Sequence, residues 1–137
     1  DLYQKMTVFQ YLIGNTDWSL PNRHNVEFLK VPGKQRLVPI AYDFDYAGMV
    51  GAFYAVPHES LPIKSVQERH FMGHGLKEAD ALATSKYFVS KKQNIIDIVN
   101  KCQGLEDKSK KSVLRYFEQF WDVVENEKSA KNTFVKE

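Results

Sequence analysis

The sequence predicts a mainly α-helical protein with one small β-hairpin, an α+β fold class. Apolar residues recur at helical spacing in three segments, 2–13, 77–102 and 107–126. Two short runs rich in β-branched and aromatic residues lie between the first and second of these segments. The chain therefore alternates one helix, one hairpin and a set of two or three long helices.

The first helix is expected over residues 2–13, and Gly14 with Asn15 ends it. The hairpin is expected from the runs 26–31 and 36–42, because the residues between them, Pro-Gly-Lys-Gln, have the composition of a turn. The helical face of the first segment is made by Leu2, Met6, Phe9, Leu12 and Ile13.

Pro39 interrupts the second strand-like run, and proline cannot donate a backbone hydrogen bond to a ladder. We therefore expect it at a bulge or with its nitrogen facing outward from an edge. Residues 43–75 follow with little periodicity and several glycines and prolines. A long irregular segment of this kind inside a compact domain is typical of functional or mobile loops.

We expect a long helix over the second segment, 77–102, with a kink or a split near Ser90 as a possibility. Cys102 falls in the apolar pattern of this helix, and we expect a buried or half-buried thiol there. The third, 107–126, follows the i, i+3, i+4, i+7 rule closely, with Asp107 as its candidate cap. The residues from about 127 onward are polar, and we expect them to be a frayed tail.

Length and composition fit one domain over residues 1–137 with a real hydrophobic core, since 43% of the residues are hydrophobic. A formal net charge of +2 does not indicate nucleic-acid binding, and we expect no nucleic-acid partner. No apolar run approaches the roughly 20 residues that a membrane span needs. A single cysteine excludes an internal disulfide and suits a cytoplasmic or a periplasmic protein.

The chain begins Asp-Leu-Tyr and enters an amphipathic pattern at once. We expect it to be the C-terminal part of a larger protein, with any targeting segment in the missing N-terminal part.

Two polar clusters flank the predicted hairpin. Asp17 lies with Asn22, His24 and Asn25 in the loop before it, and Asp43 with Asp45 directly after it. Because a hairpin returns the chain to its starting side, both loops are expected at the same end of the two strands. Carboxylate and amide oxygens suit Mg²⁺ or Mn²⁺, and a nearby carboxylate can orient a hydroxyl group. These groups are the minimal equipment for phosphoryl transfer.

This order of elements resembles the C-terminal lobe of the protein-kinase-like superfamily. It is similar to atypical bacterial branches, which include spore-coat-type and toxin-type kinases and bacterial proteins carrying GNTDWS, HN and YDFDYAG. Those motifs stand here at 14–19, 24–25 and 42–48, so the motif-bearing resemblance covers roughly residues 1–50.

The resemblance implies a role for each matching position. Asp17 matches the catalytic Asp that orients the acceptor, and Asn25, or else Asn22, matches the metal-binding Asn. Asp43 matches the metal-binding Asp of the Asp-Phe-Gly loop, while Asp45 stands where that motif has Gly and would be a second ligand. His24, Asn22 and Arg69 are accessory candidates.

The resemblance also has gaps. The sequence has no His-Arg-Asp triplet, no glycine-rich phosphate loop and no nucleotide-binding lysine before the first helix. In the family the last two features belong to an N-terminal lobe. The implied cofactors are therefore Mg²⁺ or Mn²⁺, with ATP bound only in the full-length protein, and the implied partners are that missing lobe and an acceptor substrate that the sequence does not identify.

Several alternatives stay open at this stage. Asp17 and the asparagines are also ordinary turn residues. Asp43 and Asp45 would repel each other if both ionise, and a basic partner such as Arg23, Arg36 or Arg69 would relieve that cost as well as a cation would. The chain would then be a non-catalytic pseudokinase or interaction module. A metal-dependent hydrolase is a third alternative, although it would need more ligands than the sequence offers.

Overall fold

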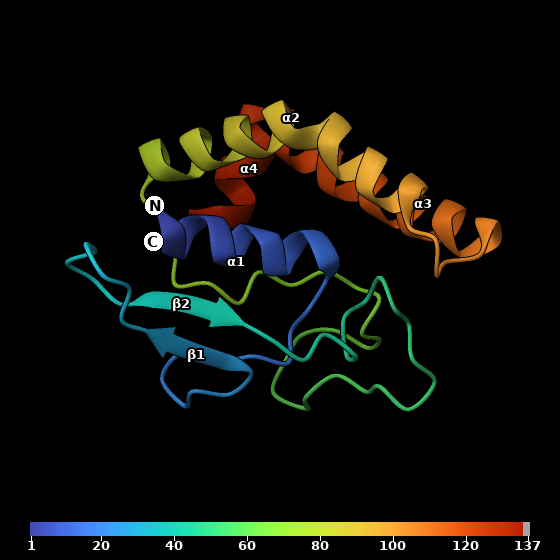
Figure 1. Cartoon of the computed structure of the whole chain (residues 1–137), viewed down its shortest axis with the longest axis horizontal. Coiled ribbons are helices and arrows are strands. Elements are labelled where there is room, and N and C mark those ends of the chain that lie inside the picture. Colours follow the sequence, from blue (N-terminus) through green and yellow to red (C-terminus); the bar gives the residue numbers. More distant parts are fainter. Residues whose placement is uncertain (136–137) are drawn as a thin grey trace. The chain divides into compact units, whose positions relative to one another are not determined.

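A computed structural model of the chain describes residues 1–135 and confirms the predicted fold class, with four helices and one antiparallel hairpin (Figure 1). The chain divides into two compact units, Asp1–Gly73 and a second unit that begins at His74. Because two compact units can belong to one domain, the single domain expected over 1–137 stays a prediction. Among the described residues, no helix has both the length and the hydrophobicity to cross a membrane.

The first unit begins with helix α1, Leu2–Ile13, which has the predicted bounds. Gly14 ends it in the left-handed conformation, with φ of 68°, and its N–H donates to the carbonyls of Gln10 and Tyr11. Glycine suits this position because it has no Cβ to clash there. Arg69 adds a second cap, since its guanidinium donates to the carbonyls of Tyr11 and Leu12 at 3.1 and 3.0 Å.

The hairpin consists of β1, Val26–Leu29, and β2, Val38–Ala41. Both strands are shorter than the runs predicted from the sequence. Pro39 lies opposite Phe28 in an unbroken register, so there is no bulge at this position. Tyr42 N–H donates to the Asn25 carbonyl, so Asn25 and Tyr42 form a hydrogen-bonded pair. Hydrogen-bonded and non-hydrogen-bonded pairs alternate along antiparallel strands, so Pro39 forms a non-hydrogen-bonded pair with Phe28. Its nitrogen therefore faces outward, as one of the two expectations required.

A small apolar core lies between α1 and the hairpin. Met6 of α1, Trp18 of the following loop and Val26 of β1 are buried against one another. Trp18 is only 4% exposed, so the aromatic residue next to Asp17 is a packing residue. Residues that pack partly against this core are Tyr3, Leu20, Ala41 and Met72. The core fixes the loop on both sides of Trp18 to the helix and to the hairpin.

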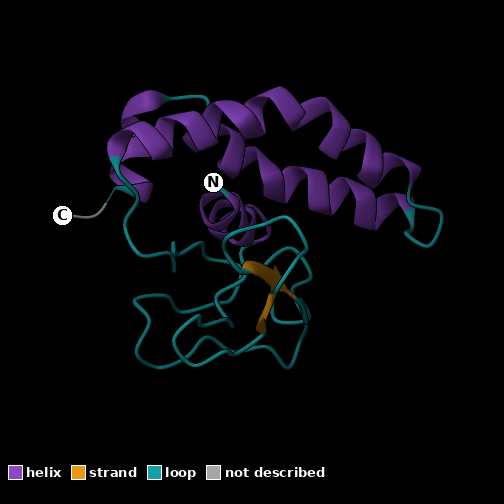
Figure 2. Ribbon diagram, turned by 60° about the vertical axis from the view of Figure 1, so that its left-hand side comes forward, coloured by secondary structure: helices purple, strands orange, loops and turns teal. Residues whose placement is uncertain are grey.

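The second unit contains α2, Glu78–Lys101, α3, Asp107–Val124, and α4, Glu127–Phe134, which pack against one another (Figure 2). Its core is aromatic, with Phe88 of α2 and Phe120 of α3 in edge-to-face contact at a centroid distance of 5.6 Å.

The expected long helix is α2, which runs through Ser90 without a split; the Ser90 hydroxyl donates to the Tyr87 carbonyl one turn earlier. Two expectations for this unit were wrong. Cys102 is exposed, because it follows the last residue of α2 and leaves its apolar face. Residues 127–134 form a helix instead of a frayed tail, capped by the Asn126 side chain and anchored by the fully buried Phe134.

A smaller correction concerns Asp107, which is the first residue of α3 and not its cap. Glu106 occupies the cap position, and no side chain caps the helix there.

Candidate functional site

The loop between α1 and β1 folds back on itself around Asp17. Ser19 and His24 exchange two backbone hydrogen bonds of 3.0 Å each, which close residues 20–23 into a tight turn. This bridge brings His24 and Asn25 back to Asp17. The Asp17 N–H donates to the side-chain oxygen of Asn15 at 2.9 Å, a two-residue turn that asparagine favours. The carboxylate of Asp17 is therefore placed by local backbone geometry.

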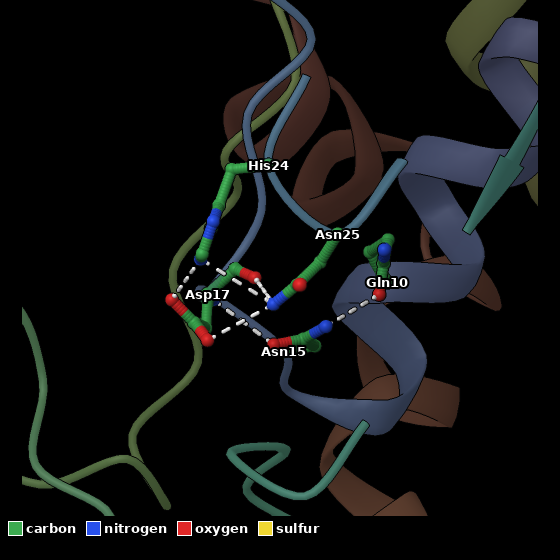
Figure 3. Close-up of polar contacts among 5 residues, drawn as sticks. All are labelled: Gln10, Asn15, Asp17, His24 and Asn25. Atoms are coloured by element: carbon green, nitrogen blue, oxygen red, sulfur yellow. Dashed lines mark hydrogen bonds and ion pairs between the residues drawn. The ribbon is translucent and has the colours of Figure 1, made fainter. Parts of the chain in front are cut away.

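The Asp17 carboxylate has a partner on each oxygen (Figure 3). The ring Nε2 of His24 lies 2.9 Å from Oδ1, and the amide nitrogen of Asn25 donates to Oδ2 at 3.1 Å. The same amide nitrogen donates to the Asp17 main-chain carbonyl at 2.8 Å. Because its nitrogen is turned toward Asp17, the Asn25 side chain keeps its oxygen for another partner.

The side chain of Asn15, which accepts from the Asp17 N–H, is itself held by a buried polar partner. Asn15 is 1% exposed, and its amide donates to the Gln10 side-chain oxygen at 3.1 Å. Sequence reasoning missed both residues. Gln10 shares the apolar stripe of α1 with Met6 and Ile13 by helical spacing, so a polar residue on that stripe was the signal.

The loop after β2, which contains Asp43 and Asp45, is hydrogen-bonded to the loop between α1 and β1. Tyr42 N–H donates to the Asn25 carbonyl, which brings the residue before Asp43 to the end of the loop that holds Asp17. Further along, the N–H groups of Gly48 and Met49 donate to the carbonyls of Gly14 and Ile13 at 3.0 and 3.1 Å. The two loops are thus joined at both ends, and the prediction that they meet is confirmed for the backbone.

Asp43 and Asp45 lie close enough to interact. The side chain of Asp45 hydrogen-bonds to Asp43 and its negative charge acts on it, which together raise the pKa of Asp43 above its ordinary range; slight burial and the charge of Asp17 add to the increase. Asp45 also accepts a hydrogen bond from the Tyr54 hydroxyl at 3.1 Å. Excess negative charge therefore gathers where the two loops meet. Sequence reasoning missed Tyr54 as a member of this site, because no pattern in the sequence pairs it with Asp45.

Backbone strain concentrates at the same place. Within residues 1–135, the non-glycine residues with positive φ are Arg23, Asn25 and Asp43, at 48°, 53° and 56°. All three belong to the two loops described above. Asn and Asp enter this left-handed region more easily than other residues, whereas Arg does so at greater cost. Strained residues of this kind cluster at functional sites.

The other candidate residues lie elsewhere. Asn22 is exposed in the turn, where its N–H donates to the Ser19 hydroxyl at 3.4 Å. Of the two asparagines, Asn25 is the one that contacts Asp17. Arg69 binds the carbonyl end of α1, as described above. Within residues 1–135, no group of three or more His, Cys, Asp and Glu side chains is arranged to hold a metal ion.

No family model, curated protein or solved structure matches this chain.

Asn25 offers a test of this geometry. Asn25→Ala is expected to lower the free energy of unfolding by about 2 kcal/mol, because two hydrogen bonds of about 1 kcal/mol each are lost. Asn25→Gly loses the same bonds but relieves the left-handed backbone, so it is expected to be the more stable variant by about 1 kcal/mol. Urea denaturation followed by circular dichroism measures both. Equal stability of the two variants would show that the backbone at this position is not strained.

The raised pKa of Asp43 predicts that the stability of the folded state depends on pH. A carboxyl group whose pKa is raised on folding stabilises the folded state below its ordinary pKa of 3.8, and this contribution is lost as the pH rises through the higher folded value. At neutral pH and without divalent cations, Asp43→Asn is therefore expected to melt at a higher temperature than the wild type, and the difference should shrink as the pH falls toward 4.

Thermal melts at several pH values measure this difference. Glu118→Gln, at an exposed position of α3, is the control for removing one negative charge. A lower melting temperature for Asp43→Asn at neutral pH would contradict the repulsion between the carboxylates.

Proposed function

We propose that residues 1–73 form the metal- and acceptor-binding part of a kinase-like, Mg²⁺-dependent phosphotransferase. The observation that carries the proposal is the electrostatic interaction of Asp43 with Asp45 and Asp17, on the two loops that flank the hairpin. The charges of Asp45 and Asp17 both raise the pKa of Asp43. Carboxylates that repel one another in this way gain from a bound cation.

The donor groups fit Mg²⁺ or Mn²⁺. Asn25 directs its amide nitrogen to Asp17, which leaves its side-chain oxygen as a neutral ligand, and its main-chain carbonyl pairs with Tyr42, the residue before Asp43. Asp43 and Asp45 supply the negative charge. Mg²⁺ is commonly held by one or two carboxylates, with waters and substrate phosphates completing the shell. Asn25 and Asp43, with Asp45 as an additional ligand, are the residues that would hold the ion.

Asp17 would orient the acceptor. Its carboxylate is 37% exposed, so a hydroxyl group can approach it. Its contacts with Asn15, His24 and Asn25 hold the carboxylate in one orientation, and positioning provides much of the catalysis in phosphoryl transfer. Bound Mg²⁺ would neutralise phosphate charge. Nucleotide binding is expected from a separate N-terminal lobe, without which this chain would be inactive.

One observation favours a second candidate, a non-catalytic pseudokinase or interaction module. Both oxygens of Asp17 already have partners inside the chain, and Asp45 accepts from Tyr54. A polar cluster that satisfies itself can serve to hold the loops in shape. In that case the carboxylates would keep these partners in the presence of divalent cations.

Manganese binding separates the two candidates. Free Mn²⁺ gives a strong electron paramagnetic resonance signal that decreases on binding. The wild type is expected to lower this signal and Asp43→Asn/Asp45→Asn to leave it unchanged, because the variant lacks both charged ligands. Glu59→Gln, an exposed acidic residue of the same unit, is the matched control and should bind as the wild type does. Equal binding by wild type and double variant, or no binding by the wild type, would remove the support for a metal-dependent transferase.

A further inference from the structure

The irregular segment after β2 presents aromatic rings to solvent. Phe53 is 98% exposed and Tyr54 is 49% exposed. The two rings lie edge to face at a centroid distance of 5.3 Å, and the ring of Tyr46 lies 6.0 Å from that of Tyr54. Large aromatic side chains grouped on a surface are a common feature of binding sites. Phe53, Tyr54, Tyr46 and Asp45 are called the aromatic–acidic surface below.

A structured loop holds these rings. The Ala55 N–H donates to the Ala52 carbonyl at 3.0 Å, which makes a turn around Phe53 and Tyr54. The Tyr54 hydroxyl is fixed on Asp45. Before the turn, Gly51 adopts the left-handed conformation, with φ of 61°, and its N–H donates to the Ala47 carbonyl. The turn and the bond to Asp45 therefore present the rings as part of a folded loop.

The aromatic–acidic surface carries the negative charge of Asp45, which accepts a hydrogen bond from Tyr54 and acts on Asp43. Between Arg36 and Lys64 in the sequence, the charged residues are Asp43, Asp45 and Glu59, although the whole chain has a formal net charge of +2. A partner that docks here gains from positive charge and loses from phosphate groups.

We propose that the aromatic–acidic surface docks a basic polypeptide segment, with a lysine or arginine side chain of that segment over the rings of Phe53 and Tyr54. Cations bind the faces of aromatic rings, and arginine does so most often. The carboxylates of Asp45 and of Asp43, on which Asp45 acts, complement the remaining positive charge. The docking does not need Mg²⁺. The interpretation of this docking as capture of the acceptor substrate rests on the proposed function, because Asp45 belongs both to the aromatic–acidic surface and to the proposed metal site.

A peptide fits this surface better than a small cation does. Val50 and Val56, on either side of the turn in the sequence, are 53% and 68% exposed. Apolar side chains of a peptide can cover these exposed valines while its basic side chains meet the carboxylates. Nucleic acids and anionic lipids carry the wrong charge for it.

Fluorescence anisotropy tests the docking with the full chain. The probe is a fluorescein-labelled peptide of alternating arginine and serine, and its control is the same peptide with glutamate in place of arginine. At low salt and without divalent cations, the wild type is expected to bind the arginine peptide and not the glutamate peptide. Phe53→Ala/Tyr54→Ala is expected to weaken binding about fivefold, from the loss of two exposed cation–ring contacts.

Two further variants sharpen the test. Tyr54→Phe keeps the ring but removes the hydrogen bond that holds it on Asp45, so its affinity should fall between those of the wild type and the double variant. Ile98→Ala removes an apolar side chain that is 71% exposed on α2 and should leave binding unchanged. Phe53 and Tyr54 lie on the surface, and circular dichroism verifies that the double variant is folded.

Three results would overturn the docking proposal: no binding of the arginine peptide, equal binding of both peptides, or unchanged affinity in the double variant. The metal experiment described above fails or succeeds separately, since no divalent cation is present here. Peptide binding without manganese binding would retain the docking surface and reject the transferase. Manganese binding without peptide binding would retain the transferase and reject the docking surface.

Discussion

The site depends on the contact between Asn25 and Asp17. One amide nitrogen donates to both the carboxylate and the main-chain carbonyl of Asp17, and this pair of bonds closes the loop between α1 and β1. The loop can close because Arg23 and Asn25 accept left-handed backbone geometry and because Trp18 anchors it in the core beneath. The side-chain amide thus links the position of the carboxylate to the start of the hairpin. Without it, Asp17 would be an ordinary turn residue.

The second constraint is electrostatic. The ladder bond between Tyr42 and Asn25 brings the loop after β2 to the loop before β1, and the bonds from Gly48 and Met49 to the end of α1 hold it there. This attachment places Asp43 next to Asp45 and within the field of Asp17, which costs free energy when all three are ionised. Hydrogen bonds from His24 and Tyr54 partly offset the cost. A bound cation would offset the remaining repulsion, and cation binding is the role proposed here for these carboxylates.

The fold class could be predicted from the sequence because its signals are local. Helix α1 shows its apolar spacing and its terminal Gly14, and the hairpin shows its turn composition. The meeting of the two loops also followed, because a hairpin has only one open end. Helix α4 was missed, since its polar sequence buries only Ala130 and Phe134 and is held by packing on α2 and α3. Gln10 and Tyr54 were missed for a different reason, because each is polar and its side-chain partner is defined only once the loops are folded.

Diffraction from crystals soaked in Mn²⁺ tests metal binding at this site, because anomalous scattering locates the ion without assumptions about its ligands. We expect one strong peak at about 2.1–2.2 Å from the Asn25 side-chain oxygen and from a carboxylate oxygen of Asp43. The contacts of Asn25 with Asp17 should remain as they are. A peak elsewhere, or no peak while Asp17, Asp43 and Asp45 keep their present partners, would contradict metal binding at this site and leave the cluster as a structural device of the loop.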